Sequence, residues 1–184
     1  MRPPVPFNVP VTSNRPAAPR LSSACTGWAQ TARFDIETQD GATVLQAQMR
    51  DRGAYRIAWR GPDRLDLTEI DSDDNERQLL FTANIDVIER ALIGLLGDDI
   101  RDDLELPFLD LPTAAKEVAA GYQLSEMVRG YRTLTRIGTG PVAAARDETL
   151  SLILLVPLSH FLTVSIDDLK RSFLNESGHP LLTR

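Results

Sequence analysis

The chain has 184 residues, of which 42% are hydrophobic and 25% are charged. These fractions are typical of a soluble globular protein, and the length predicts one domain. The 26 acidic and 20 basic side chains give a formal net charge of −6, which argues against a nucleic-acid-binding protein with a general basic face and favours a basic partner. Cys25 is the single cysteine, so a small secreted fold held by intrachain disulfides is excluded.

Residues 1–20 hold six of the twelve prolines and few large apolar side chains. This composition predicts a mobile, Pro-rich tail ahead of one folded domain over residues 21–184. The tail lacks the uninterrupted apolar stretch of a signal peptide, and no segment approaches the roughly 20 apolar residues of a membrane span. We therefore expect a cytoplasmic protein that binds neither a membrane nor nucleic acid.

The first half of the domain is predicted to be one helix followed by strands. Ser22 or Ser23 can cap a short helix that ends near Ala32, with Trp28 as its buried anchor. The hydrophobic pattern then changes to a period of two, which predicts strands around residues 44–49, 55–60, 65–68 and 78–82. The intervening turns are too short for crossover helices, so neighbouring strands should pair antiparallel as a meander.

A central helix is predicted to begin at Asn84, which can cap it. One apolar stripe follows at helical spacing, formed by Ile85, Ile88, Leu92 and Leu95. Gly97 can supply the left-handed residue that ends this helix. A second short helical piece is expected over residues 98–105, ending before Pro107.

The last third predicts a hairpin and further helices. Strands at 131–137 and 142–145 flank the turn Gly138–Pro141. The run 150–156 is apolar on both faces and fits either a buried strand or the start of a helix. Pro157 suits the first turn of a helix over 157–162. Ser165 can cap another helix, in which Leu169 and Phe173 are buried. A last extended piece is expected at 180–183.

Together these elements predict an α+β fold. An antiparallel sheet, built from the meander over residues 43–82 and the hairpin over residues 131–156, would be covered by N-terminal, central and C-terminal helices. The pattern leaves open whether the two groups of strands form one sheet or two.

The reactive residue types do not form a recognisable metal or cofactor site. Cys25, His160 and His179 share no zinc-ligand spacing. The segment 71–76 starts like a calcium loop, but Glu76 stands where the sharp bend requires glycine, so a solvated acidic turn between strands is expected instead. Gly138-Thr139-Gly140 lacks the third glycine and the following helix of a dinucleotide loop.

Catalysis by neighbouring side chains is not predicted either. Ser159 and His160 are adjacent on an expected helix and therefore do not face each other. We expect no catalytic residues and no cofactor, and thus a binding protein rather than an enzyme. The alternative is a small enzyme whose site is assembled in space from residues such as Asp71, Ser159 and His160.

An acidic cluster stands out after the central helical stripe. It contains Asp98, Asp99, Asp102 and Asp103, and it could present carboxylates to a basic partner or simply solvate a helix.

Four segments in the second half, in one order and spacing, are similar to a known family. They are 81–89 (FTANIDVIE) leading through Leu92 to Gly97 and Arg101, 158–162 (LSHFL), 170–174 (KRSFL) and 178–182 (GHPLL). Over roughly residues 75–183, and more weakly back to Trp28, the chain resembles the bacterial immunity proteins that include the immunity factor of the tuberculosis necrotizing toxin.

The resemblance implies an antitoxin that acts by contact. Such a protein binds a cognate secreted NAD-glycohydrolase toxin domain one-to-one in the cytosol of the producing cell and occludes its active site. It implies no catalytic residue, no metal and no cofactor. The alternative is a non-catalytic regulatory protein-interaction module with a Pro-rich docking tail.

The resemblance does not supply the interface. Six shared residues are expected to preserve the fold: Leu158, His160, Leu162, Phe173, Gly178 and Pro180. Contact surfaces in such pairs must discriminate between partners, so the partner-binding candidates are the four aspartates of the acidic cluster, Asp98, Asp99, Asp102 and Asp103.

Overall fold

The computed structural model describes residues 17–49 and 51–182. These residues form four α-helices, α1 (Ser23–Thr31), α2 (Ile85–Asp103), α3 (Glu148–Phe161) and α4 (Ile166–Leu174), and one short 3₁₀ helix at Ala115–Glu117. The strands are β1 (Phe34–Gln39), β2 (Ala42–Ala47), β3 (Ala54–Gly61), β4 (Arg64–Ile70), β5 (Glu76–Thr82), β6 (Tyr122–Leu124), β7 (Tyr131–Arg136) and β8 (Gly140–Arg146).

All eight strands belong to one antiparallel sheet in the order β1-β2-β3-β4-β5-β8-β7-β6. The meander β1–β5 and the group β6–β8 meet where Phe81 of β5 pairs with Ala144 of β8. The predicted α+β class is therefore confirmed, and the question of one sheet or two is answered as one.

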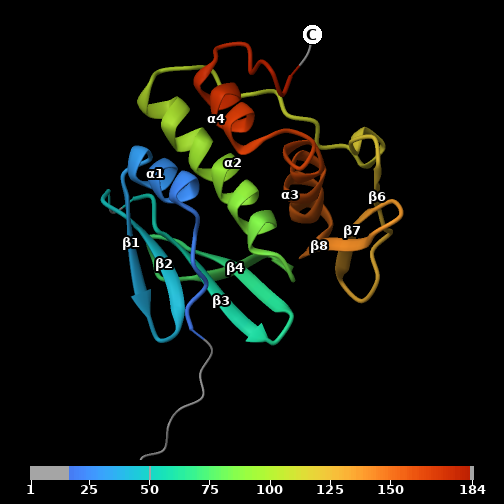
Figure 1. Ribbon diagram of the computed structural model, residues 1–184, viewed down its shortest axis with the longest axis horizontal. Helices are drawn as coiled ribbons and strands as arrows, with labels where there is room; N and C mark the ends of the chain where they lie inside the picture. The colour runs from blue at the N-terminus through green and yellow to red at the C-terminus, as the bar shows by residue number, and fades with distance from the viewer. Residues whose placement is uncertain (1–16, 50, 183–184) are drawn as a thin grey trace, which may run out of the picture.

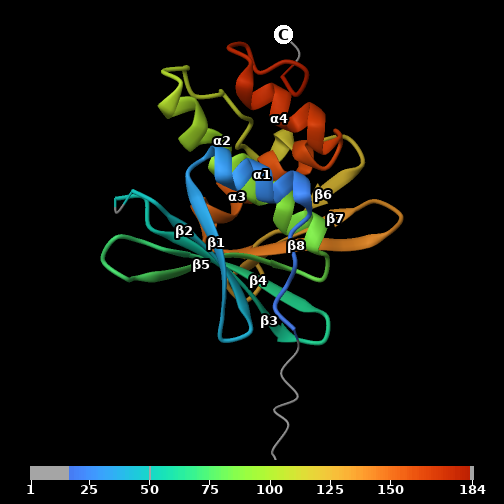
Figure 2. The same ribbon diagram turned by 60° about the vertical axis from the view of Figure 1, so that its left-hand side comes forward.

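The helices lie on a single side of the sheet, in two layers (Figures 1 and 2). Helices α1, α2 and α3 contact the sheet or each other, whereas α4 packs mainly on α2. The inward side chains of neighbouring strands, such as Leu45, Ile57 and Leu67, are fully buried, as is Leu92 of α2. Trp28 of α1 is also buried, and its indole Nε1 donates a hydrogen bond to the carbonyl of Ile93 at 3.0 Å.

The central helix is longer than its sequence pattern suggested. The Asn84 cap is confirmed, since its side chain accepts from the amide of Asp86 at 2.9 Å. The predicted stop at Gly97 and the separate piece over residues 98–105 are wrong, because α2 runs unbroken to Asp103. Gly97 has a packing role instead: a Cβ built there would lie 2.3 Å from the Phe173 ring of α4.

The apolar run 150–156 is helical, so the predicted hairpin ends at Arg146. Helix α3 begins after Asp147, whose carboxylate accepts from the amides of Thr149 and Leu150, both at 2.9 Å. Pro157 therefore lies well inside α3 and not in a first turn, which corrects that prediction. The run is apolar on most sides because α3 packs against both the sheet and α2.

The other differences are at short or terminal segments. Strands β1 and β6 were not predicted; β1 reads FDIETQ, and only its first residue is fully buried. The extended piece expected at 180–183 is a turn through Leu182, and Thr183 lies outside the described residues. Most of the predicted tail, residues 1–16, also lies outside them, whereas Pro19 is buried and its carbonyl accepts a hydrogen bond from the Thr43 hydroxyl.

Candidate partner-binding surface

The four predicted aspartates all lie on the last turns of α2. Asp98 and Asp102 are four residues apart, as are Asp99 and Asp103, so each pair shares one line along the helix. Asp102 and Asp103 are exposed, while Asp98 and Asp99 are half-buried. The helix thus brings the four close together but aims them in two directions.

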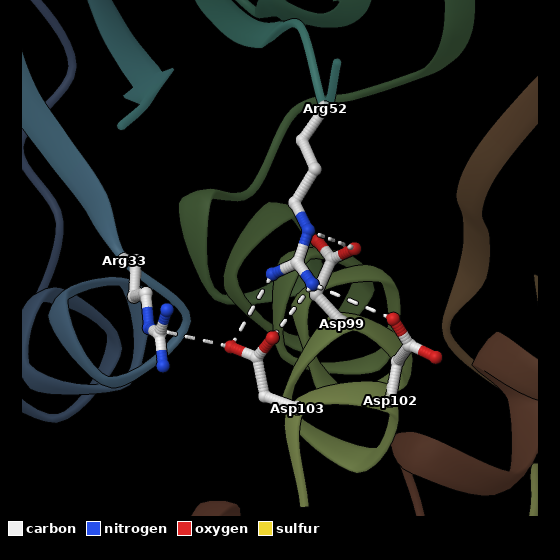
Figure 3. A network of polar contacts seen from close by, with 5 residues as sticks. All are labelled: Arg33, Arg52, Asp99, Asp102 and Asp103. Atoms are coloured by element: carbon white, nitrogen blue, oxygen red, sulfur yellow. Dashed lines mark hydrogen bonds and ion pairs between the residues drawn. The ribbon is translucent and has the colours of Figure 1, made fainter. Parts of the chain in front are cut away.

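Three of these carboxylates surround one arginine of the same chain (Figure 3). Arg52, in the turn between β2 and β3, contacts Asp103 at 2.8 Å, Asp102 at 3.6 Å and Asp99 at 3.7 Å. Arg33 adds a second contact to Asp103 at 3.5 Å. We call these five residues the Arg52 network.

The network neutralises much of the acidic cluster. The hydrogen bond from Arg52 holds the pKa of Asp103 below its usual value, and the same carboxylates raise the pKa of Arg52. The pKa of Asp99 is raised, because its burial outweighs the attraction of Arg52. Asp99, Asp102 and Asp103 already have a cation within the chain, so they are weaker candidates for a basic partner than the sequence alone suggests.

Asp98 has a different environment. Neighbouring helical residues point about 100° apart, so Asp98 points to a different side of α2 than Asp99, and it lines a hollow of about 370 Å³ between α2, α3 and the segment 109–113. The hollow is lined by three polar side chains, Asp98, Asp110 and Thr113, and by Leu80, Ala91, Gly94, Leu95, Leu109, Leu111, Ile153, Leu154, Pro157, Leu158 and Phe161. We call it the Asp98 hollow.

The Asp98 carboxylate forms no ion pair or side-chain hydrogen bond with any described residue. Burial and the nearby carboxylate of Asp99 raise its pKa to about 6, although the Arg101 guanidinium acts in the opposite direction. At neutral pH the hollow therefore contains an ionised carboxylate in mainly apolar surroundings. Such a group is available to a cation brought by another molecule.

The substitution Asp98→Asn is expected to stabilise the isolated protein at neutral pH. The pKa of the group is about 6 in the fold and 3.8 as the ordinary value, so the ionised form opposes folding. Allowing for partial exposure to solvent, the unfolding free energy should rise by about 1 kcal/mol at pH 7.5. Urea denaturation across pH should show this gain above pH 6, shrinking as pH falls through 6 and absent near pH 4. A gain independent of pH would contradict this origin.

A second hollow lies on the opposite face of the sheet. Phe81 of β5 and Tyr131 of β7 meet edge to face at 5.5 Å, with Arg64 stacked on Phe81 at 4.1 Å and Arg146 on Tyr131 at 4.8 Å. Phe81, Tyr131 and Arg64 border a hollow of about 520 Å³ that also includes Val128, which is 61% exposed. Arginine and aromatic side chains are enriched in protein interfaces. No pattern in the sequence predicts this surface, because strands far apart in the chain build it.

The six residues shared with the resembling family lie in packed positions or turns. Leu158 and Phe173 are buried in the core, and Gly178 is buried with a φ of +76°, a conformation that favours glycine. Leu162 and Pro180 are half-buried, and the Nε2 atom of His160 lies 2.7 Å from the carbonyl oxygen of Glu117. These contacts suit a role in preserving the fold, which stays a prediction.

The residues of the alternative enzyme hypothesis have separate partners. The Ser159 hydroxyl donates to the carbonyl of Val156 at 2.6 Å and accepts from the amide of Ala119, while Asp71 accepts from the amides of Asp73 and Asn75 in the β4–β5 turn. Within residues 17–49 and 51–182, no group of three or more His, Cys, Asp or Glu side chains is placed to hold a metal ion.

By length and apolar composition, no single helix of the described residues qualifies as a membrane span. Helices α3 and α4 meet that test only as a pair, bent by 115°.

Comparison with known proteins identifies the family of this chain. The family model described as Immunity protein 61 matches residues 28–181. The chain is 32% identical over 175 residues to "Immunity factor for TNT" of Mycobacterium tuberculosis and to "Immunity factor for TNT homolog" of Mycobacterium bovis, and each alignment covers 89% of this chain and 93% of the relative. A solved structure, "Rv3902c from M. tuberculosis", matches with a TM-score of 0.75 at 28% identity, over 88% of this chain and 92% of that chain. The chain therefore belongs to the immunity protein 61 family.

Proposed function

We propose that this protein is a cytosolic immunity protein that binds a cognate NAD-degrading toxin domain one-to-one and occludes its active site. The observation that carries the proposal is the match, over 93% of their length, to relatives named as immunity factors for TNT. Inhibition by contact requires a complementary surface and no catalytic residue, metal or cofactor of its own. The separate environments of Asp71, Ser159 and His160 support this reading over a small enzyme.

The proposal is tested by titrating the toxin domain encoded beside this protein's gene with purified protein while NAD hydrolysis is followed. We expect activity to fall linearly and reach zero at an equimolar ratio, because a tight complex that blocks the active site inhibits stoichiometrically. Isothermal titration calorimetry should give the same one-to-one ratio. A complex that forms without loss of NAD hydrolysis would contradict occlusion, and the absence of any complex would overturn the proposal.

A truncation separates this proposal from a regulatory module that docks through its Pro-rich tail. Removal of residues 1–16 leaves intact the contact between the Pro19 carbonyl and Thr43. Under the immunity proposal the shortened protein inhibits the toxin domain as the full chain does. Under the docking-tail alternative it loses its partner.

A further inference from the structure

The Asp98 hollow combines three properties. It is concave, its walls are mainly apolar, and its one half-buried carboxylate forms no ion pair with a described residue. The other hollow, on the opposite face of the sheet, differs on this last point, because the carboxylate that lines it, Asp63, is exposed. The Asp98 hollow therefore offers a half-buried carboxylate with which a cation of a partner can pair.

We infer that the Asp98 hollow receives a lysine or arginine side chain of the bound toxin domain, with the cation paired to Asp98 and the side-chain stem lying against α2 and α3. This inference rests on the proposed function, because the toxin domain supplies the cation.

The shape and chemistry of the hollow fit that occupant. Lysine and arginine carry a charge at the end of an apolar stem, and such stems bury readily along apolar surface. Leu109, Leu111 and Leu154 offer that surface, while Asp98 and Asp110 are the two carboxylates that line the hollow. Ile153, which is 51% exposed, gives the partner an apolar contact on the same surface. An anionic or purely apolar side chain would leave the Asp98 carboxylate buried without compensation.

The carboxylate also works against the stability of the free protein. Its partial burial, without an ion pair to a described residue, disfavours the ionised form, whereas Asp102 on the next turn is exposed and lies 3.6 Å from Arg52. A group that opposes folding and lies in a hollow is typical of a functional position. A bound cation would offset the unfavourable free energy of burying the ionised Asp98 carboxylate, and this gain would favour the complex over the free protein.

The test compares Asp98→Asn with Asp102→Asn in binding to the toxin domain. Both changes remove one negative charge from the end of α2, but only the first removes the half-buried carboxylate of the hollow. We expect Asp98→Asn to weaken binding at least tenfold, mainly through faster dissociation, because buried charge pairs act on the dissociation rate. Asp102→Asn should change the affinity less than twofold. Circular dichroism and urea denaturation show that both variants are folded.

The partner residue is located by replacing the exposed lysines and arginines of the toxin domain one at a time with alanine. For one such variant, Asp98→Asn should lose its effect and bind within twofold of the wild-type chain, as expected for two residues that contact each other. Equal binding by wild type and Asp98→Asn would overturn the inference and leave the proposed function standing. A change in oligomeric state of Asp98→Asn, measured by light scattering, would instead indicate a second copy of this chain in the hollow. Failure of the wild type to bind would overturn the proposed function itself.

Discussion

Arg101→Met is expected to cost about 3–4 kcal/mol of unfolding free energy, and thus to lower the melting temperature by about 10 °C. The Arg101 side chain is fully buried near the C-terminal end of α2. Its Nε donates to the carbonyl of Pro107 at 2.7 Å, and its two terminal nitrogens donate to the carbonyls of Phe173 and Asn175, both at 2.8 Å, and of Glu176 at 3.1 Å.

The expected loss of unfolding free energy is large because methionine cannot donate the hydrogen bonds that Arg101 donates. It fills a similar volume but donates no hydrogen bond, so three carbonyl groups at the end of α4 and that of Pro107 lose their partner. The carbonyl end of a helix also attracts a cation, which adds to the loss. Burial lowers the pKa of Arg101 from its ordinary value, yet the guanidinium stays charged in this carbonyl cage.

Arg90→Met is the matched control for this prediction. Arg90 lies on the same helix and also donates to two carbonyls, of Phe161 and Val164, but it is half-buried and its contacts are longer, at 3.3 and 3.4 Å. We expect a loss of about 1 kcal/mol or less. The midpoint of urea unfolding measures both variants. Similar losses for the two arginines would show that the burial of Arg101 is not the source of its effect.

Gly97→Ala is expected to destabilise the protein by about 1–3 kcal/mol, although alanine is the better helix former. A Cβ at Gly97 would lie 2.3 Å from the Phe173 ring, which is fully buried and meets Phe161 edge to face at 6.0 Å. The ring cannot move without disturbing that aromatic pair. The substitution therefore separates α2 from α4, and differential scanning calorimetry should show the lower melting temperature.

Gly27→Ala serves as the opposite control. Gly27 lies inside α1, and a Cβ built there meets no atom within 4 Å. Here only the helix preference acts, so alanine should stabilise by about 0.5–1 kcal/mol. If both glycine substitutions raised the melting temperature, the packing role of Gly97 would be refuted.

The hydrophobic periods and the capping residues were enough to place most elements. Alternation around Leu45, Ile57 and Leu65 identified three strands of the meander, and Asn84 and Ser165 marked the starts of α2 and α4. These features are local, because a period or a cap involves residues only a few positions apart. Strand β1 was missed since its outer positions are exposed, which leaves a weak pattern in FDIETQ.

The acidic cluster could be recognised in the sequence, but the different environments of its four aspartates could not. The sequence does not distinguish between the four aspartates Asp98, Asp99, Asp102 and Asp103. Arg52, which pairs with three of them, comes from the turn between β2 and β3, and the walls around the fourth come from α3 and the segment 109–113. Only the folded chain distinguishes the carboxylates that contact Arg52 from Asp98, which forms no ion pair with a described residue.

The sequence by itself determined the α+β class, the antiparallel meander, the main helices and, through its resemblance to immunity proteins, the kind of function. Tertiary structure alone decided that the meander and the hairpin join through Phe81 and Ala144. It also decided that Gly97 packs against Phe173 and does not end α2, and that Arg101 donates hydrogen bonds to the end of α4. The physical reason is separation along the chain. Side-chain patterns report the interactions of neighbours, whereas the packing of Phe173 on Gly97 and the charge left in the Asp98 hollow depend on residues distant in sequence.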